Sequence, residues 1–385
     1  MRIAFLGTRG IPNCYGGFEQ FVTYIAPMLA QRGHRVTVYN SSLNRYRGKF
    51  FKDVRIIIKP DPQNIMGPAG QFIYDLLCIL DARKNNFDLI FQLGYTSSSI
   101  WSFLFPGNSV LATNMDGMEW KRSKYHAWVQ WFLKRAESWA VKRSDLLIAD
   151  SFGIRDYLVN KYGFPVVYIP YGANEFESPD AKVPGSFGLR PFEYDLMIAR
   201  CIPENNIEMI LKGYLQADSE RKLVIIGMDK SAYANYLIKQ FSDPHIVFEN
   251  SLYAEQILNN LRYYSNIYFH GHSAGGTNPS LLEAIAARCL VAAHDNIFNR
   301  EVLENNAYYF KNEREVAELI KMRLSKSAHS HFLENNSNKI KAFYNWENIL
   351  NLIDMKIIST VTKSPRQHQA AYLQHLKSLM SELKV

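Results

Sequence analysis

Short apolar runs alternate with longer amphipathic stretches through the first half of the chain. The runs are rich in aliphatic and β-branched residues, and they predict strands at residues 2–6, 36–39, 89–92, 110–113, 146–149 and 166–169. The stretches between them space apolar residues as one face of a helix does, at 18–31, 71–82, 125–142 and 153–161. Repeated strand–helix units of this kind predict a parallel sheet.

The alternation restarts after a loop rich in proline and glycine at residues 178–191. It predicts strands at 194–199, 223–226, 246–249, 267–270 and 290–293, and helices at 207–216, 232–241, 255–264 and 280–288. We therefore predict an α/β protein with two doubly wound, Rossmann-like domains, residues 1–170 and 171–345, and a ligand-binding cleft between them. Further helices after residue 313 end at 346–357, and a polar tail follows.

The composition excludes several classes of protein. With 385 residues, of which 47% are hydrophobic and 21% charged, the chain has enough apolar side chains for two cores and is not predominantly disordered. Its longest apolar runs are too short for a membrane-spanning helix, and its apolar start is too short for a signal peptide. The four cysteines form no CxxC pair, which argues against a disulfide framework and a zinc site. A soluble cytoplasmic protein is expected.

The net charge of +8 belongs to the first half of the chain. Lys and Arg outnumber Asp and Glu by 21 to 12 in residues 1–170, against 23 to 24 in residues 171–385. Two interpretations stay open: a solvated basic surface without a partner, or a surface that meets an anionic one such as a membrane or a phosphate. No nucleic-acid recognition module is visible, so nucleic acid is not expected as a partner.

The turn after the first predicted strand lacks the signature of dinucleotide-binding proteins. It contains no G-x-G-x-x-G, and the second strand ends at Asn40 instead of an acidic residue. Gly16 and Gly17 directly precede a predicted helix, where N–H groups and the helix dipole favour a phosphate or a sugar hydroxyl. Glycines that only form a turn remain the alternative.

Two loops of the second half follow strands at the edge where parallel sheets bind ligands. Arg200 ends the first of these strands; its guanidinium suits a diphosphate, although an ordinary ion pair would explain it too. The later loop runs from His270 to Pro279, and the helix that follows carries Glu283. The loop is a candidate anion cradle, and Glu283 is either a ligand for vicinal ribose hydroxyls or a carboxylate favoured near a helix start. His270 and His272 would suit a metal, but no third ligand is evident.

Polar and aromatic residues also gather after the predicted strand at 110–113. Just past its carboxyl end, the usual place for catalytic groups in such sheets, stand Asp116, Glu119, Trp120, Lys121 and Arg122. Such a cluster suits a sugar, held by hydrogen bonds and a stacking indole.

Taken in order, these four motifs resemble the retaining glycosyltransferases of family 4, which have the GT-B fold. The resemblance runs from residue 1 to about residue 356 and includes Pro203-Glu204 after Arg200, and the segment GGTNPSLLEA at 275–284. Residues 7–12 and 116–122 resemble the rhamnosyltransferase-like branch, which builds bacterial surface polysaccharides. The resemblance also implies that residues 346–385 form a crossover helix and tail that pack on the first domain.

Residue roles follow from the resemblance, position by position. The donor-binding residues would be Gly16, Gly17, Arg200, Asn205, His272, Gly275, Gly276, Thr277, Asn278 and Glu283. The acceptor-binding residues would be Arg9, Tyr15, Glu19, Trp120, Lys121 and Arg122, and the catalytic residues Asp116, Glu119 and Arg200.

This sequence departs from the family pattern at three positions. The first Glu of the family's E-x7-E motif falls at Gly275, and the second cation of its diphosphate clamp falls at Asn205. The family's histidine in the first domain aligns near Asp116, to which its role would pass. The phosphate charge would then rest on Arg200 and on helix N-termini.

The implied activity is retaining transfer of L-rhamnose from dTDP-β-L-rhamnose to a saccharide on polyprenyl pyrophosphate. Because the sequence contains no D-x-D pair, transfer is expected to need no metal, and no cofactor is expected besides the nucleotide-sugar substrate. Three alternatives stay open: another UDP-, GDP- or dTDP-sugar donor, a nucleotide-sugar epimerase, and a non-catalytic subunit of an assembly complex.

The basic first half then gains an expected partner, the anionic surface at the cytoplasmic face of the inner membrane. The segment 125–143 combines cations with large aromatic side chains, as helices in the membrane interface do: Lys134, Arg135, Lys142 and Arg143 accompany Trp128, Trp131, Phe132 and Trp139. Alternatively, the aromatic residues belong to the core and the cations are simply solvated.

Overall fold

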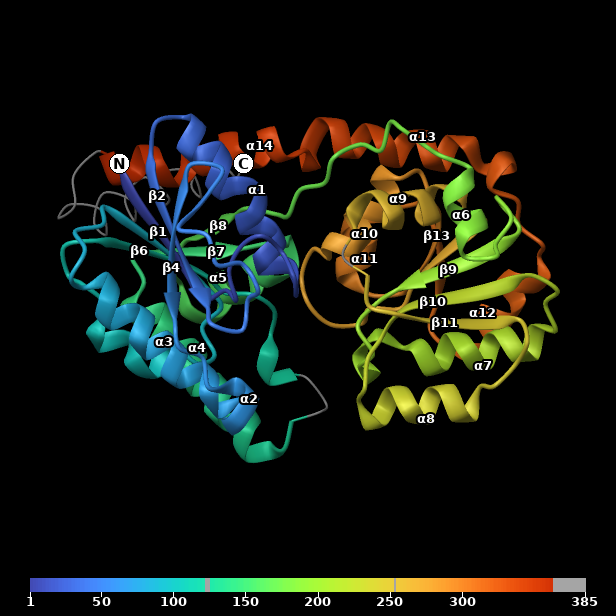
Figure 1. The fold of residues 1–385 in the computed structure, drawn as a ribbon, viewed down its shortest axis with the longest axis horizontal. Coiled ribbons are helices and arrows are strands. Elements are labelled where there is room, and N and C mark those ends of the chain that lie inside the picture. Colours follow the sequence, from blue (N-terminus) through green and yellow to red (C-terminus); the bar gives the residue numbers. More distant parts are fainter. Residues whose placement is uncertain (122–124, 253, 363–385) are drawn as a thin grey trace. The chain divides into compact units, whose positions relative to one another are not determined.

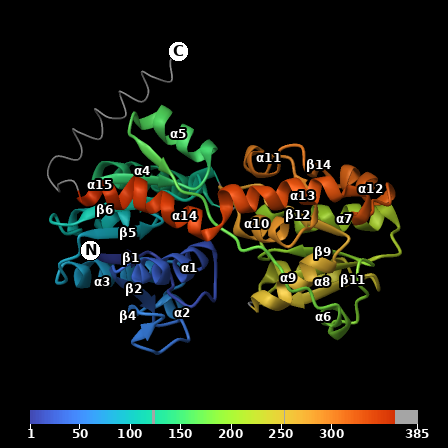
Figure 2. The same cartoon turned by 90° about the horizontal axis from the view of Figure 1, so that it is seen from above.

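The computed structural model describes residues 1–121, 125–252 and 254–362. The chain forms two compact units. Of the described residues, the first unit comprises 1–121, 125–170 and 346–362, and the second comprises those within Tyr171–Asn345. Each unit is an α/β layer structure with helices on both faces of one sheet (Figures 1 and 2). The predicted α/β fold with two Rossmann-like domains is confirmed.

The first unit contains an eight-stranded sheet in the order β3-β4-β2-β1-β5-β6-β7-β8. All neighbouring strands are parallel except β3 and β4, which form an antiparallel edge. The strands are β1 (Arg2–Leu6), β2 (Arg35–Ser41), β3 (Phe50–Phe51), β4 (Val54–Lys59), β5 (Leu89–Leu93), β6 (Val110–Asn114), β7 (Leu146–Ala149) and β8 (Val166–Tyr168). The helices are α1 (Gly17–Gln31), α2 (Gln63–Met66), α3 (Ala69–Ala82), η1 (Ser99–Leu104), η2 (Glu119–Lys121), α4 (Ala127–Arg143) and α5 (Phe152–Tyr162).

The second unit contains a six-stranded, fully parallel sheet in the order β11-β10-β9-β12-β13-β14. Its strands are β9 (Tyr194–Ile198), β10 (Lys222–Met228), β11 (Ile246–Asn250), β12 (Ile267–His270), β13 (Leu290–His294) and β14 (Tyr308–Phe310). Its helices are α6 (Lys182–Ser186), η3 (Pro203–Asn205), α7 (Ile207–Ala217), α8 (Ala232–Gln240), α9 (Glu255–Tyr264), α10 (Pro279–Ala286), α11 (Ile297–Leu303), α12 (Glu313–Lys321), η4 (Lys326–His329), α13 (Ser330–Lys339) and η5 (Ile340–Tyr344).

Side chains that point alternately to the two faces of each sheet form the two hydrophobic cores. On β1, Ala4 and Leu6 face a cluster with Tyr74 and Cys78 of α3, all of them fully or nearly fully buried. Because successive side chains of a strand point to opposite faces, the intervening residues of β1 support the layer on the other side. In the second unit a larger apolar cluster joins β9, β10 and β12 to α7, α8 and α12. The central strands of both sheets, such as β1 and β12, are therefore buried.

The last helices of the described chain belong to the first unit. They are α14 (Trp346–Ile353), η6 (Asp354–Ile358) and α15 (Ser359–Thr362). Trp346 is buried and stacks on Tyr24 of α1, with ring centroids 4.6 Å apart. Arg32, directly after α1, makes ion pairs with Glu347 and Asp354. An aromatic stack and two ion pairs therefore hold α14 and η6 against α1 and the residue that follows it. Among the described residues, no helix has the length and apolarity that crossing a bilayer requires.

Candidate active site

In the second unit, the loop after β9 is tied to the loop after β12. The Asn205 amide donates to the carbonyl oxygen of Arg200 at 2.8 Å, which closes the turn that carries the Arg200 side chain into solvent. The amide of Asn206 donates to the carbonyl oxygen of Gly271 at 2.7 Å. Asn205 and Asn206 thus bring Arg200 and the glycine-rich loop to one edge of the sheet. Asn205 is buried, so its side chain stabilises the turn through this hydrogen bond.

Gly271 is the point where the two loops touch. A Cβ atom built on Gly271 would lie 2.2 Å from the carbonyl oxygen of Asn205, so no larger residue fits without moving the backbone. The backbone N–H and the hydroxyl of Ser273 then donate to the carbonyl oxygen of Glu204, at 3.0 and 2.9 Å. The positions of the Arg200 turn and of the glycine-rich loop therefore depend on each other.

The glycine-rich loop ends in a capped helix start. The Asn278 side chain accepts a hydrogen bond from the Ser280 N–H at 2.9 Å, and Pro279 occupies the first turn of α10. Gly275 has φ +113°, a conformation that favours glycine, and a Cβ there would meet no atom within 4 Å. Thr277 is buried. The loop thus combines an open stretch at Gly275 with a fixed helix N-terminus.

Glu283 is held by a buried arginine that the sequence did not reveal. Arg262 Nη2 lies 2.5 Å from Glu283 Oε2, and the side chain of Arg262 is 2% exposed against 20% for Glu283. Arg262 Nη1 donates to Asn259 Oδ1 at 2.9 Å. Burial opposes ionisation of the Arg262 side chain, but the Glu283 charge raises its pKa above the ordinary value. The carboxylate therefore has a fixed orientation on α10.

Two histidines stack at the end of β12. The rings of His270 and His272 are 4.3 Å apart between centroids and nearly parallel. Both ring nitrogens of His270 are buried without a hydrogen-bond partner among the described residues. Burial, with the neighbouring His272, lowers the pKa of His270 well below its usual value, so this imidazole is neutral. In the described ranges, no three or more His, Cys, Asp and Glu side chains form a group that could hold a metal ion.

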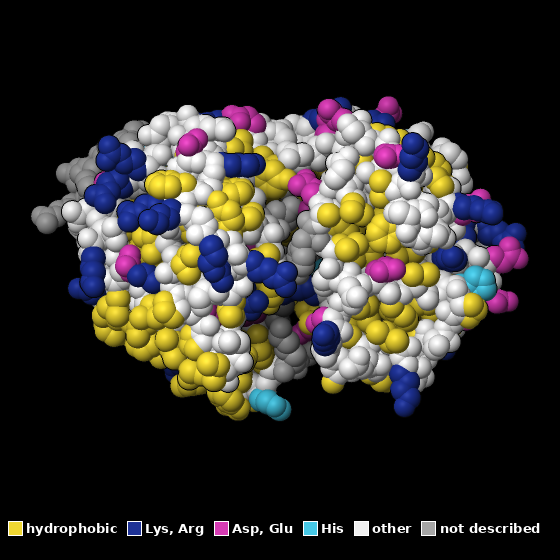
Figure 3. Space-filling model, viewed as in Figure 1, with side chains coloured by type: hydrophobic (Ala, Val, Ile, Leu, Met, Phe, Trp, Pro, Cys, Tyr) yellow, Lys and Arg dark blue, Asp and Glu magenta, His cyan; other side chains and the backbone are white. Residues whose placement is uncertain are grey.

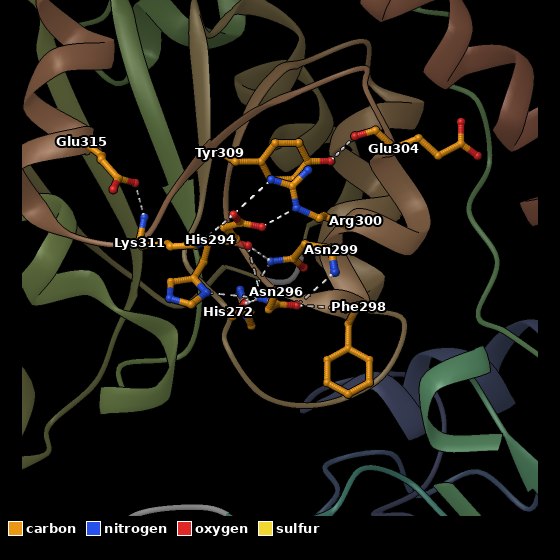
Figure 4. A network of polar contacts seen from close by, with 11 residues as sticks. His272, His294, Asn296, Phe298, Asn299, Arg300, Glu304, Tyr309, Lys311 and Glu315 are labelled. Carbon is orange, nitrogen blue, oxygen red and sulfur yellow. Dashed lines mark hydrogen bonds and ion pairs between the residues drawn. The ribbon is translucent and has the colours of Figure 1, made fainter. Parts of the chain in front are cut away.

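The backbone of His272 is fixed by asparagines at the start of α11 (Figure 4). The amides of Asn296 and Asn299 each donate to the His272 carbonyl oxygen at 3.0 Å. Asn296 Oδ1 accepts from the N–H groups of Phe298 and Asn299, which caps the helix. The glycine-rich loop is therefore anchored from the start of α11 as well as from the Arg200 turn.

In the first unit, the loop after β1 is closed by the residues expected to bind the acceptor. Glu19 is buried, and its Oε1 accepts from the Arg9 N–H at 2.7 Å and from the Thr8 hydroxyl at 3.0 Å. The guanidinium of Arg9 lies 3.5 Å from the ring centroid of Tyr15, which is 39% exposed. Arg9 Nη2 also donates to Gln63 of α2 at 2.9 Å. Glu19 shapes the loop, while Tyr15 is exposed and Arg9 is partly exposed on its surface.

The same loop ends at the start of α1, where no side chain caps the helix. Gly16 occupies the N-cap position of α1 without a side-chain cap, and Gly17 is the first helical residue. Asn40, at the end of β2, exchanges two hydrogen bonds with the backbone of Ile11, at 3.1 and 2.8 Å. Asn40, whose place at the end of the second strand argued against dinucleotide binding, therefore fixes the turn that precedes α1.

The cluster after β6 packs around a buried carboxylate on α4. Glu137 is 1% exposed and accepts hydrogen bonds from Trp120 Nε1 at 3.1 Å, the Tyr157 hydroxyl at 2.9 Å, Lys161 Nζ at 2.7 Å and the Tyr162 hydroxyl at 2.7 Å. Burial and this contact with Glu137 raise the pKa of Tyr162 to about 12. Glu137 therefore fixes the indole of Trp120, a role that sequence reasoning missed because the two residues lie on different elements.

Asp116 and Glu119 stand beside this centre. Asp116 has φ +51°, and its N–H donates to Asn114 Oδ1 at 2.9 Å. Glu119 is buried, and Lys121 Nζ lies 5.5 Å from the Trp120 ring centroid. Arg122 lies outside the described residues. The hydroxyl of Tyr95, just past β5, is buried without a hydrogen-bond partner among the described residues, and the negative charges of Glu137, Glu119 and Asp116 add to the effect of burial in raising its pKa.

Comparison with known proteins defines the class of fold. Residues 1–174 match the sequence model of a family described as a domain of unknown function (DUF1972). We find no match among curated proteins. Among solved structures, sucrose-phosphate synthase from Thermosynechococcus elongatus is similar with a TM-score of 0.77 and 14% identity, over 94% of this chain and 100% of that chain.

Two further structures support the same conclusion. The Anabaena protein HepE in complex with UDP-glucose is similar with a TM-score of 0.74 and 17% identity, over 93% of this chain and 100% of that chain. An α,α-trehalose 6-phosphate synthase from Burkholderia multivorans is similar with a TM-score of 0.68 and 12% identity, over 94% and 99% of the two chains. The expected GT-B class of fold is therefore confirmed.

Proposed function

We propose that the protein is a glycosyltransferase that uses a nucleotide sugar as donor. The observation that carries this proposal is the edge of the second sheet, where the Arg200 turn, the glycine-rich loop and Glu283 are joined by the Asn206–Gly271 hydrogen bond and the Arg262–Glu283 ion pair. A guanidinium and a helix N-terminus suit a diphosphate, and an oriented carboxylate suits vicinal ribose hydroxyls. The similar structures include an enzyme named for sucrose phosphate synthesis and a complex with UDP-glucose.

The proposed donor is dTDP-β-L-rhamnose, and the proposed acceptor is a saccharide on polyprenyl pyrophosphate at the cytoplasmic face of the inner membrane. This choice rests on the resemblance of residues 7–12 and 116–122 to rhamnosyltransferase-like enzymes. Arg9, Tyr15, Trp120 and Lys121 of the first unit are the exposed or partly exposed side chains proposed for the acceptor saccharide.

Transfer exchanges one bond of the anomeric carbon for another. The bond to the diphosphate oxygen breaks, a bond to the acceptor oxygen forms on the same face of the sugar, and the proton of the acceptor hydroxyl leaves with the diphosphate. Negative charge grows on the leaving group, so Arg200 and the N–H groups around Gly275–Asn278 lower the barrier by stabilising it. Asp116 and Glu119 orient the acceptor hydroxyl. No step in this scheme requires a metal ion.

A transfer assay with labelled nucleotide sugars and a lipid-linked saccharide tests the activity. Labelled lipid supports the transferase; interconversion of the nucleotide sugar without acceptor would indicate an epimerase, and no reaction with any donor a non-catalytic subunit. We expect Arg200→Ala to lower kcat/KM by about 100-fold or more, as loss of one donor to a developing anion does. The control is Arg190→Ala, since that side chain is 83% exposed. Near-normal transfer by Arg200→Ala would contradict the assigned site.

Ligand-induced thermal shift against dTDP-rhamnose, UDP-glucose and GDP-mannose tests the donor, because a ligand that binds only the folded protein raises Tm by mass action. The largest shift is expected with dTDP-rhamnose. A shift with a UDP-sugar alone would reject the rhamnose donor and leave the transferase proposal standing.

A further inference from the structure

Neighbouring helices of the first unit expose several large apolar side chains. Ile65 and Met66 of α2, Phe103 of η1, and Trp128 and Trp131 of α4 are 83%, 49%, 70%, 72% and 61% exposed. We call these five residues the apolar face. Figure 3 shows hydrophobic side chains gathered over α2 and α3 on the corresponding part of the surface. Single exposed apolar residues are ordinary, but a group of this size marks an interaction surface.

The elements that carry the apolar face are one connected layer. The indole of Trp101 in η1 donates to the Phe72 carbonyl oxygen in α3 at 2.9 Å. Arg143, at the end of α4, donates to the carbonyl oxygens of Ser102 and Phe105, both at 3.0 Å. Phe72 of α3 and Phe132 of α4 have ring centroids 5.9 Å apart. The exposed side chains therefore stand on a fixed scaffold of packed helices.

The charges that this layer exposes to solvent are mainly positive. The helices α2, α3, η1 and α4 contain three carboxylates: Asp75 and Glu137 are buried, and Asp81 makes an ion pair with Lys59 at 2.5 Å. By contrast, the cations of the same layer reach solvent or stand at its ends: Arg83, Lys84, Lys134, Arg135, Lys142 and Arg143. The face that exposes tryptophan, isoleucine and phenylalanine thus carries a net positive charge.

We propose that the apolar face inserts into the interface of an anionic lipid bilayer. Tryptophan favours the boundary between headgroups and acyl chains, and nearby Lys and Arg side chains are attracted to lipid phosphates. A second copy of the chain would suit the surface less well, because a two-fold contact brings the same cations face to face. The bilayer supplies both an apolar medium and the negative charge.

The loops proposed to hold the acceptor are attached to this layer. Arg9 donates to Gln63, the first residue of α2, and Ile65 stands two residues further along. Trp120 donates to Glu137 of α4, and Lys134 Nζ of the same helix lies 4.6 Å from the Trp120 ring centroid. Insertion would thus leave the carboxyl edge of the first sheet next to the headgroups, where the saccharide of a lipid-linked acceptor lies. This last step rests on the proposed function, whereas insertion itself does not.

The test is binding of the full chain to vesicles, with no reaction required. We expect the protein to sediment with vesicles of phosphatidylglycerol and phosphatidylcholine, and brominated lipid to quench its tryptophan fluorescence. Trp128→Ser/Trp131→Ser should weaken this binding about tenfold or more. The matched control is Ile297→Ser/Phe343→Ser in the second unit, where each side chain is 65% exposed, and it should bind as the parent chain does. Circular dichroism confirms that both variants fold.

A second pair of variants tests the charge. Arg135→Gln/Lys142→Gln should lower binding to phosphatidylglycerol vesicles several-fold and flatten its dependence on salt, while Lys239→Gln/Arg314→Gln, on exposed helix positions of the second unit, should change neither. Equal binding by the Trp128→Ser/Trp131→Ser variant and the parent chain would overturn the proposal. Self-association that this variant abolishes, without vesicle binding by the parent, would assign the face to a second copy. Vesicle binding without sugar transfer would retain insertion and reject the proposed function.

Discussion

Arg262 Nη2 lies 2.5 Å from Glu283 Oε2, so a fully buried arginine orients the carboxylate that we assign to the nucleotide ribose. Arg262 comes from α9 and Glu283 from α10, and Asn259 shares the guanidinium. The ion pair should therefore affect both the stability of the second unit and nucleotide-sugar binding, and the two effects can be measured separately.

Replacing Glu283 by Gln should lower the free energy of unfolding by about 3 kcal/mol, because it leaves the buried Arg262 charge uncompensated. Urea denaturation measures this change. The double variant Arg262→Met/Glu283→Gln should recover a large part of the loss, since it removes both charges. Nucleotide-sugar binding, measured by calorimetry, should stay weak in both. A double variant less stable than Glu283→Gln would show that the ion pair is not the cause.

Two glycines of the same loop should respond differently to alanine. Gly271→Ala places a Cβ 2.2 Å from the Asn205 carbonyl oxygen, so the Arg200 turn or the loop must move, at a cost of about 3 kcal/mol. Gly275→Ala meets no atom within 4 Å and costs only the strain of its positive φ, about 1 kcal/mol. Urea denaturation of both variants checks the order, and equal losses would contradict the assigned close contact.

The buried carboxyl of Asp75 should make the stability of the first unit depend on pH. Burial raises the pKa of Asp75 to about 7, although the Ser97 hydroxyl donates to it at 2.5 Å. Between the unfolded pKa near 4 and about 7, the folded state binds the proton more tightly, so its stability falls as pH rises. The loss should reach roughly 2–4 kcal/mol by pH 8.

The control for this effect is Asp75→Asn, which keeps the shape and removes the titration. Its unfolding free energy should be close to that of the parent chain at pH 4 and higher at pH 8, as measured by urea denaturation at both values. Equal differences between the two proteins at the two pH values would show that Asp75 does not titrate in this range.

Glu137→Gln should destabilise the first unit, because four donors now share an amide with one acceptor oxygen. Loss of the charge beside Lys161 and of hydrogen bonds in a buried site costs roughly 3 kcal/mol. Asp156→Asn on α5 is the control, since that carboxylate is 57% exposed, and it should change stability by less than about 0.5 kcal/mol. Thermal unfolding followed by circular dichroism compares them.

Much of the fold could be predicted from local pattern. The predicted strands at 2–6, 146–149 and 267–270 and the predicted helix at 255–264 have the bounds of β1, β7, β12 and α9. The strands β3, β4 and β14 were missed. β3 has only two residues, and β14 has three and pairs with β13. β4 alternates buried Ile56 with exposed Arg55, so none of the three forms a long apolar run.

For the candidate site, the sequence indicated the loops but not what holds them. The order of strands, glycine-rich loops and helices along the chain places Arg200 and Glu283 after predicted strands. Because ligands bind at the carboxyl edge of parallel sheets, this order made both residues candidates for the site. Arg262, Glu137 and Asn206 act on residues of other elements, and no periodicity or spacing marks such contacts. Which side chains share an edge follows from tertiary packing, and the binding roles themselves stay predictions.

The contact between Trp346 and Tyr24 affects the order in which a growing chain can fold. During synthesis α1 is complete early, but Trp346, which packs on Phe21 and Tyr24 of α1, leaves the ribosome only after the whole second unit. The nascent first unit must therefore wait for this contact while more than 170 further residues, Tyr171–Asn345, are made. The second unit is continuous in sequence and can fold as soon as it emerges, whereas the first unit, although started first, is completed last.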